Sequence, residues 1–399
     1  MLDFSEEHRV AQKAIRAWCT EHLGPKVPRL ESGETLPYPL IRELGATFGI
    51  PDMVRASFAR MQARAAEGGG KAGLAGPGEG PLMAILMMEL SRFCPGFALA
   101  FGASLGLCGG AILSRGTPEQ KQRFALPVMT MEKIGSWALT EPGAGSDAFG
   151  SMKTRARKVD GGWRLSGSKT LITNAPFAEV FVVYARMQGD DYAPGDVRAF
   201  IVERGAAGLS TGKPFKKMGM HASPTGEVFL DDVLVPRDQI LGGEDAENAR
   251  SAAKSSLKGE RFGMTPMCLG IVDRCLEESV RYAKEREQWG KPIATYQLVQ
   301  AKIAEMYTAR SIIHALLMRQ LEADKAGVAL SVEEASASKL YCARVTTQVA
   351  MEAVQLKGGA GYMQEGIVEM LARDAKLFQI GGGTDEIQIL RIAREVLER

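Results

Sequence analysis

The chain has 399 residues, of which 45% are hydrophobic, so it can bury more than one core and form two or three domains. Its 49 Lys and Arg residues nearly balance 47 Asp and Glu residues, and a net charge of +2 offers no excess for binding nucleic acid. Because no signal-peptide pattern and no run of about 18 uninterrupted apolar residues is found, we expect a cytoplasmic protein without a membrane-inserted segment.

Cysteine and histidine residues show none of the spacings of a metal site or a catalytic triad. The six cysteines are scattered without a C-x-x-C pair, and the four histidines stand far apart in the sequence. We therefore expect buried, reduced thiols, and neither a disulfide framework nor a metal centre.

Helical periodicity dominates the first part of the chain. Apolar residues recur at helical spacing in Pro81–Phe93 and in Gln120–Val128, which predicts an N-terminal all-α domain over residues 1–130. The segment Glu67–Pro81 (EGGGKAGLAGPGEGP) is too rich in glycine and proline for a helix or a strand. It indicates an ordered loop, a lid or a disordered spacer.

The pattern changes to a period of two in residues 131–240, which predicts a middle β domain. Asp160-Gly161-Gly162 lies between two of the β-rich runs and predicts a hairpin turn. The predicted strands are Thr154–Lys158, Trp163–Ser166, Val180–Ala185, Val197–Val202 and a last one in Gly226–Pro236.

Helical periodicity returns in residues 241–399, the third predicted domain. The order α, β, α indicates an α+β fold that is mainly α. The predicted helices are Ser255–Glu287, Thr295–Gly327, Val332–Leu356 and a last one from Asp385.

Three glycine-bearing segments lack the context of a Rossmann or a P-loop phosphate site. TEPGAGSD (Thr140–Asp147) follows an apolar strand and is either a tight turn or a loop that offers backbone N–H groups to a polar ligand. QLKGGAGY (Gln355–Tyr362) ends a helix. In GGGTDEIQ (Gly381–Gln388), Thr384 can cap the last helix, with two acidic residues in its first turn.

The order and spacing of these segments resemble the acyl-CoA dehydrogenase family over nearly the whole chain. The resemblance implies an N-terminal helical domain, a middle β-barrel-like domain, a C-terminal four-helix domain and bound FAD. Further segments that resemble the family are MELSR (Met88–Arg92), GSKTLITN (Gly167–Asn174), GERFGMTPMCLGIV (Gly259–Val272), EREQWGKPIATYQLVQ (Glu285–Gln300) and IAR (Ile392–Arg394).

The resemblance also implies which residues bind FAD. One group lies beside the flavin ring: Trp137, Leu139, Thr140, Ser146, Leu171, Ile172 and Thr173. The family usually has tryptophan where this chain has Leu171, so one aromatic surface is lost. A second group is expected to hold the pyrophosphate and the adenine across a subunit interface of a homotetramer or homodimer: Arg286, Gln297, Gln355, Gly358 and Gly359, with Thr384 and Glu386 in the same cradle.

Dehydrogenation of a thioester removes an α-proton and passes the β-hydrogen as hydride to flavin N5. Most of the family carries the base as the Glu of a Tyr-Glu-Gly-Thr motif, but here that position is Gly382. Isovaleryl-CoA and long-chain acyl-CoA dehydrogenases instead use a Glu before an Arg on the first long C-terminal helix. That pair is Glu260-Arg261 in this chain, so we expect Glu260 to be the catalytic base.

The resemblance implies that the substrate is an acyl-CoA thioester whose carbonyl oxygen meets the N–H of Gly382. The resemblance extends the substrate site to Ser146, Arg261 and Gly383, and implies an electron-transferring flavoprotein as acceptor. Two alternatives stay open. The same scaffold can act on a carrier-protein thioester or an unusual acyl group, or it can be a non-catalytic FAD-binding subunit of a heteromeric dehydrogenase.

Overall fold

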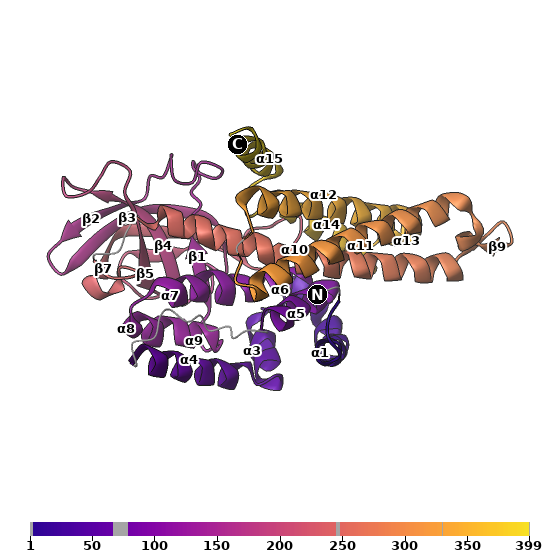
Figure 1. Ribbon diagram of the computed structural model, residues 1–399, viewed down its shortest axis with the longest axis horizontal. Helices are drawn as coiled ribbons and strands as arrows, with labels where there is room; N and C mark the ends of the chain where they lie inside the picture. The colour runs from indigo at the N-terminus through magenta and orange to yellow at the C-terminus, as the bar shows by residue number, and fades with distance from the viewer. Residues whose placement is uncertain (1–2, 67–78, 245–247, 329, 399) are drawn as a thin grey trace.

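The computed structural model describes residues 3–66, 79–244, 248–328 and 330–398, and for residues 64–66, 79 and 250–262 it describes the backbone only. A curled seven-stranded sheet lies at one end of the molecule, and the helices that precede and follow it in the chain form the rest (Figure 1). The predicted α, β, α order is confirmed. Most of the glycine-rich Glu67–Pro81 segment, residues 67–78, lies outside the described residues.

The N-terminal helices begin with α1, which starts after Ser5 because the side chain of Ser5 accepts the N–H of His8. The predicted helices Pro81–Phe93 and Gln120–Val128 are confirmed, the latter in three consecutive helical pieces. The elements are α1 (Glu6–Trp18), α2 (Val27–Glu31), α3 (Tyr38–Thr47), α4 (Ile50–Ala66), α5 (Glu79–Phe93), α6 (Pro95–Gly102), α7 (Gly110–Arg115), α8 (Pro118–Gln120) and α9 (Leu126–Met129), with π-helical turns at Cys19–Leu23, Ala103–Gly109 and Lys121–Ala125 and a 3-10 turn at Gly24–Lys26.

One helical stretch in the described part of the chain, Pro95–Arg115, is long and apolar enough to cross a membrane. The fold explains its composition in another way, because 67% of this stretch is buried inside the protein, as expected for a core helix. All six cysteines are free and buried, which confirms the expected reduced thiols.

The sheet has the order β1-β4-β2-β3-β7-β6, and β5 pairs with β4. The predicted hairpin is confirmed: β2 and β3 are antiparallel, with Val159 opposite Gly162 and Gly161 at φ 82° in the turn. The strand predicted at Trp163–Ser166 was too short, because β3 runs on through the GSKTLIT segment. The strands are β1 (Gly135–Ala138), β2 (Arg155–Val159), β3 (Gly162–Thr173), β4 (Val180–Gln188), β5 (Val197–Glu203), β6 (Leu209–Thr211) and β7 (Thr225–Pro236).

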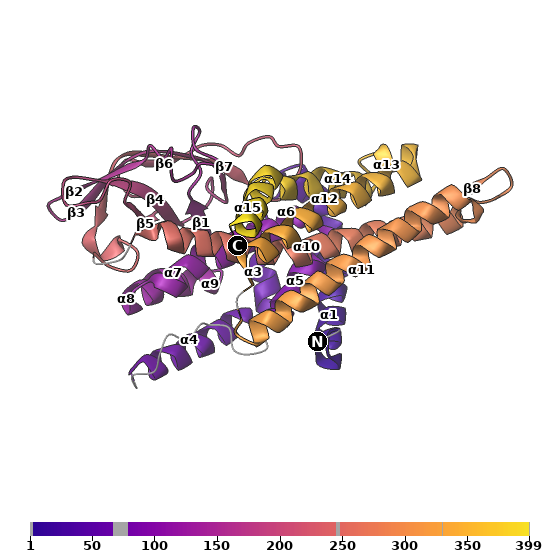
Figure 2. The same ribbon diagram turned by 45° about the horizontal axis from the view of Figure 1, so that its top comes forward.

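Two long antiparallel helices, α10 and α11, extend away from the sheet and are joined by the short ribbon β8–β9 (Figures 1 and 2). The predicted long helices are confirmed, although α10 begins before Ser255 and α14 was not predicted. The elements are α10 (Ala249–Glu285), β8 (Glu287–Gln288), β9 (Lys291–Pro292), α11 (Gln297–Lys325), α12 (Val332–Lys357), α13 (Gly359–Tyr362), α14 (Ile367–Ala375) and α15 (Asp385–Leu397), with 3-10 turns at Arg237–Gln239, Ile293–Thr295 and Lys376–Gln379.

Helices α5 and α10 are in backbone contact at Gly270. A Cβ atom at this position would lie 2.1 Å from the carbonyl oxygen of Met88, so this crossing requires glycine. Beside the crossing, the buried guanidinium of Arg92 on α5 pairs with Asp273 at 4.0 Å and with Glu277, both on α10. These contacts fix α10 against the N-terminal helices.

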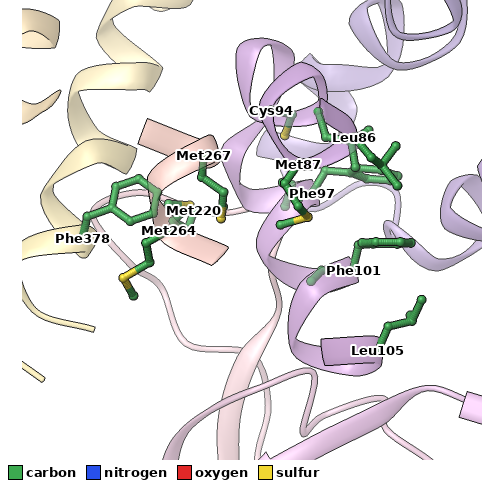
Figure 3. Close-up of a cluster of buried hydrophobic side chains, with 14 of the residues drawn as sticks. Leu86, Met87, Cys94, Phe97, Phe101, Leu105, Met220, Met264, Met267 and Phe378 are labelled. Carbon is green, nitrogen blue, oxygen red and sulfur yellow. The ribbon is translucent and has the colours of Figure 1, made fainter. Parts of the chain in front are cut away.

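One buried core joins the three regions of the chain. Figure 3 shows its centre, where side chains from the N-terminal helices meet Met220 from the loop between β6 and β7 and residues of the C-terminal helices. The contributing side chains include Leu86, Met87, Phe97, Phe101, Leu105, Met220, Met264, Met267 and Phe378.

Asp374 of α14 is buried at the junction of the three regions. Its Oδ1 accepts the backbone N–H of Met220. Glu31 of α2 pairs with Arg373 at 3.3 Å in the same place. A Cβ atom at Gly219 would lie 2.6 Å from Oδ1 of Asp374, so glycine permits this close approach of loop and helix.

Burial and the negative charge of Glu31 raise the pKa of Asp374 to about 7, although the N–H of Met220 and the cations of Arg373 and Lys217 act in the opposite direction. Between the pKa of a free aspartate and about 7, the folded protein therefore binds more protons than the unfolded chain. This group lowers the free energy of unfolding as the pH rises through that interval.

Asp374→Asn keeps an oxygen acceptor for the N–H of Met220 but removes the titrating carboxyl. The stability of the variant relative to the parent should improve between pH 5 and pH 8, by up to about 3 kcal/mol. Thermal unfolding at both pH values measures this, with Asp190→Asn as an exposed control. An equal difference in Tm at both pH values would contradict the assignment.

Candidate active site

The residues expected beside the flavin come together on β1, β3 and the loop after β1. Trp137 on β1 is partly buried, and its Nε1 donates to the hydroxyl of Tyr184 at 3.2 Å. The loop is tied to β3 by the N–H of Thr170, which donates to the carbonyl of Thr140 at 2.9 Å. Ser136 donates to the carbonyl of Thr173 at 2.7 Å. Leu139 and Ile172 are buried here, whereas Ser146 is exposed.

Leu171 lies in an irregular part of β3, where the register with β7 shifts between Lys169 and Ile172. Its backbone is left-handed, with φ 57°, and its side chain is 64% exposed. A bulky residue rarely adopts this conformation, and such strain often occurs at functional positions. The side chain that replaces the family's tryptophan therefore projects from the surface, next to the buried Ile172 in β3.

The glycine turn before α15 is held by side chains from inside the protein. Gly382 and Gly383 have positive φ angles of 64° and 92°. The ammonium of Lys339 donates to the carbonyl of Gly383 at 2.8 Å, and Nε2 of Gln388 donates to the same oxygen at 2.9 Å. The predicted cap is confirmed, because the hydroxyl of Thr384 accepts the N–H of Ile387.

An open cavity of about 340 Å³ lies beside this turn and the first turn of α15. Thr384 and Glu386, both predicted cofactor residues, line it together with the cations of Arg344 and Lys376. Hydrogen bonds from its own N–H and from Thr384 lower the pKa of Glu386, so this carboxylate is ionised. The cavity combines donors and acceptors that suit a ligand with hydroxyl and phosphate groups.

The glycine turn lies against α10 close to position 260. A Cβ atom at Gly381 would lie 3.9 Å from Cε of Met264, which is one helical turn after residue 260. At Gly263 of α10, a Cβ atom would meet none of the described atoms within 4 Å. Glu260 and Arg261 belong to α10, and their side chains lie outside the described residues.

Thr384 and Glu386, predicted to share one cradle with Arg286, lie at the glycine turn, whereas the rest of that second group lies elsewhere in the chain. Arg286 directly precedes β8, and Gln297 begins α11 just after the ribbon; both are exposed. The ribbon lies at the end of the molecule opposite the large sheet (Figure 2). Positions 260 and 285 are separated by about 38 Å along α10 at the rise of an α-helix. One chain therefore does not bring Arg286 to Trp137.

Gln355, Gly358 and Gly359 are also exposed, at the end of α12 and the start of α13. Gly358 ends α12 with φ 58°. They share the ribbon's half of the molecule, since Lys357 pairs with Glu278 of α10 at 3.2 Å. The predicted FAD residues thus lie in three parts of one chain: Trp137 and its neighbours at the sheet, Thr384 and Glu386 at the glycine turn, and the other five in the ribbon's half.

Sequence reasoning missed three cations at the glycine turn: Lys339, Arg344 and Lys376. Lys339 is 1% exposed on a helix whose neighbouring buried residues are mostly small. A lysine on the buried face of an amphipathic helix is a signal for a specific polar partner. That partner, the carbonyl of Gly383, lies 44 residues away in the sequence and could not be identified without the fold.

Three domain descriptions of one family match this chain. They are "Acyl-CoA dehydrogenase, N-terminal domain" over residues 5–132, "Acyl-CoA dehydrogenase, middle domain" over 136–233 and "Acyl-CoA dehydrogenase, C-terminal domain" over 250–397. The chain belongs to the acyl-CoA dehydrogenase family. It is thus an FAD-type oxidoreductase that dehydrogenates acyl-CoA.

Individual relatives agree with this membership. The mitochondrial isovaleryl-CoA dehydrogenase of Arabidopsis thaliana is 38% identical over 318 residues, which cover 79% of this chain and 76% of the relative. The solved structure of the acyl-CoA dehydrogenase of Bacillus anthracis complexed with FAD has a TM-score of 0.87 and 30% identity, over 99% of this chain and 68% of the other. A chain described as "Electron transferring flavoprotein of Acidaminococcus fermentans: Towards a mechanism of flavin-based electron bifurcation" has a TM-score of 0.85 with 30% identity, over 100% of this chain and 99% of the other.

The geometry of the described residues fits FAD, the cofactor of the family. At Gly143, Gly145, Gly358 and Gly359 a Cβ atom would meet none of the described atoms within 4 Å, so backbone faces open space in the segments assigned to the cofactor. Among the described residues, the guanidinium of Arg286 has no carboxylate partner within 4.0 Å and can pair with a diphosphate. Open backbone and a guanidinium are suited to a flavin dinucleotide.

Proposed function

We propose that this acyl-CoA dehydrogenase uses Glu260 as the base that removes the α-proton of the thioester. The observation that carries the proposal is the contact between the glycine turn and α10. The family's usual base position, Gly382, bears no side chain, and the adjacent Gly381 lies by Met264, one turn from position 260. A carboxylate carried by α10 at position 260 is thus close in the fold to the carboxylate that this chain lacks.

The surroundings of position 260 favour this role. Met264 and Met267 of α10 pack with Met220 and Phe378 in the buried core (Figure 3). Apolar neighbours and the exclusion of water by a bound acyl chain raise the pKa of a carboxyl, which strengthens it as a proton acceptor. When bound, FAD takes up the hydride that leaves the β-carbon.

The glycine turn supplies the donor for the thioester oxygen. Removal of the α-proton places negative charge on this oxygen, and the N–H of Gly382 is the group we assign to stabilise it. Lys339 and Gln388 hold the turn rigid through the carbonyl of Gly383. A donor that is fixed before the reaction does not have to be reoriented as charge develops.

The acyl group is proposed to be branched or bulky at its α and β carbons. Three consecutive glycines, Gly381–Gly383, carry no side chains at the turn, and a Cβ atom at Gly263 of α10 would meet none of the described atoms within 4 Å. The similarity to a relative named isovaleryl-CoA dehydrogenase supports a branched substrate. The similarity to a chain in the structure of an electron-transferring flavoprotein supports such a protein as electron acceptor.

Glu260→Gln keeps the shape of the side chain but removes the proton acceptor. We expect the best acyl-CoA to reduce the bound flavin about 10²- to 10⁴-fold more slowly, with FAD content unchanged. The loss of flavin absorbance under anaerobic conditions measures this rate. Glu305→Gln, an exposed change on α11, is the control.

If Glu260→Gln reduces its flavin as fast as the parent, Glu260 is not the base. The reciprocal double change, Glu260→Gly with Gly382→Glu, should recover only part of the rate, because position 382 has φ 64° and a side chain there is strained. If only carrier-protein thioesters reduce the flavin of the parent protein, the substrate is the carrier-protein alternative. If no thioester reduces it, the protein is the non-catalytic subunit.

Arg286→Ala should weaken FAD binding in an oligomer whose cofactor sites are shared between subunits, because Arg286 lies at the end of the chain opposite the sheet. When Arg286→Ala chains are co-expressed with Glu260→Gln chains, roughly a quarter of the sites should combine an intact Glu260 with the partner's intact arginine. These sites should regain turnover. FAD content and turnover of the co-expressed protein measure this.

Lys284→Ala, an exposed cation close to Arg286, should leave FAD content unchanged. A monomer with full FAD occupancy, or co-expressed variants that regain nothing, would show that the two groups of residues do not share one site.

A further inference from the structure

The side chain of Lys169 is completely buried under the loop that follows β1. Its ammonium donates to the carbonyl of Leu139 at 3.1 Å and to Oε1 of Glu141 at 2.8 Å. The side chains of Lys169 and Glu141 are both buried, with exposures of 0% and 4%. A lysine that is removed from water in this way needs specific partners, and here both partners belong to one three-residue segment.

Glu141 extends the same arrangement to another part of the chain. Its Oε2 accepts the N–H of Lys153 at 2.6 Å and its Oε1 accepts the N–H of Thr154 at 2.9 Å, just before β2. The buried pair therefore joins β3, the loop after β1 and the start of β2. Burial lowers the pKa of Lys169 to about 8, opposed by the charge of Glu141, and the ammonium remains protonated at neutral pH.

Fixing the carbonyl of Leu139 also fixes the next N–H. The peptide unit is planar and trans, so the N–H of Thr140 points opposite to the carbonyl of Leu139. Because that carbonyl is directed at the buried ammonium of Lys169, the N–H of Thr140 is directed away from it. The N–H of Thr170 holds the carbonyl of Thr140 from the same strand at 2.9 Å, and this fixes the following peptide unit as well.

We propose that Lys169 and Glu141 are a positioning pair for the cofactor: they hold the backbone at Leu139–Thr140 so that the N–H of Thr140 is presented to the flavin ring. The pair touches neither FAD nor substrate. This inference rests on the proposed assignment of the loop after β1 to the flavin. An ordinary buried ion pair can often be replaced by hydrophobic residues without loss of stability. A positioning pair, in contrast, is needed for cofactor binding even where stability does not require it.

Two variants separate positioning from stability. Lys169→Met removes the donor to Leu139 and leaves the buried carboxylate of Glu141 without its cation, so both thermal stability and FAD affinity should fall. Lys169→Met with Glu141→Gln removes the uncompensated charge and should regain much of the stability. It still lacks the ammonium that holds the carbonyl of Leu139, so its FAD affinity should stay roughly 10- to 100-fold below that of the parent.

The measurement is the release of FAD on dilution of the holoprotein, followed by flavin fluorescence, with thermal unfolding and the visible flavin spectrum recorded for each variant. In the double variant we expect a changed flavin spectrum and faster release at near-parental stability. Arg164→Met, a surface cation on the same strand, is the control and should change none of these values.

If the double variant regains FAD affinity and spectrum together with stability, the pair is structural only and the inference is overturned. The same holds if both variants retain FAD as the parent does. If Lys169→Met does not fold, the double variant still decides between these results. A parent protein that binds no FAD contradicts the proposed function instead, so the two failures are distinguishable.

Discussion

The architecture depends on the contact between α5 and α10 at Gly270. Because no Cβ intervenes, the backbone of α10 lies directly against the carbonyl of Met88, and the buried Arg92 secures the crossing through Asp273 and Glu277. This contact fixes the position of α10, a helix of 37 residues, and thereby the positions of the elements at its two ends. The glycine turn before α15 packs against α10 at Met264, and the ribbon β8–β9 follows the end of α10.

The two ends of α10 carry different parts of the proposed chemistry. Position 260 lies near the glycine turn, Met264 and the apolar core, where a thioester could lose its α-proton without competition from water. Arg286 follows the other end, about 38 Å away along the axis. A helix of this length cannot bring both to one cofactor, so a shared site between subunits reconciles the family's FAD residues with the geometry of one chain.

Local sequence signals predicted much of this fold. The period of apolar residues predicted α11 and α12 within two residues at each end. The Asp160-Gly161-Gly162 turn predicted the hairpin, and the threonine at position 384 predicted the N-cap of α15. These features depend on neighbours in the sequence. The assignment of the cofactor residues came from resemblance, since no single glycine motif identified the ligand.

Other features could not be read from the sequence because their causes are distant contacts. The bulge that leaves Leu171 exposed arises from a register shift between β3 and β7, and nothing in the Thr-Leu-Ile run signals it. Lys169 resembles any strand lysine until the fold places it beside Leu139 and Glu141. The raised pKa of Asp374 likewise depends on its burial in the fold and on Glu31, which is more than 300 positions earlier in the chain.

The most direct test of the account is a crystal structure of the holoprotein with FAD and a saturated thioether analogue of acyl-CoA, which binds but cannot be dehydrogenated. We expect the carboxylate of Glu260 beside the carbon that corresponds to the α-carbon, the N–H of Gly382 facing the position of the thioester oxygen, and Arg286 of a neighbouring subunit on the pyrophosphate. Another carboxylate beside that carbon, with Glu260 turned away, would contradict it.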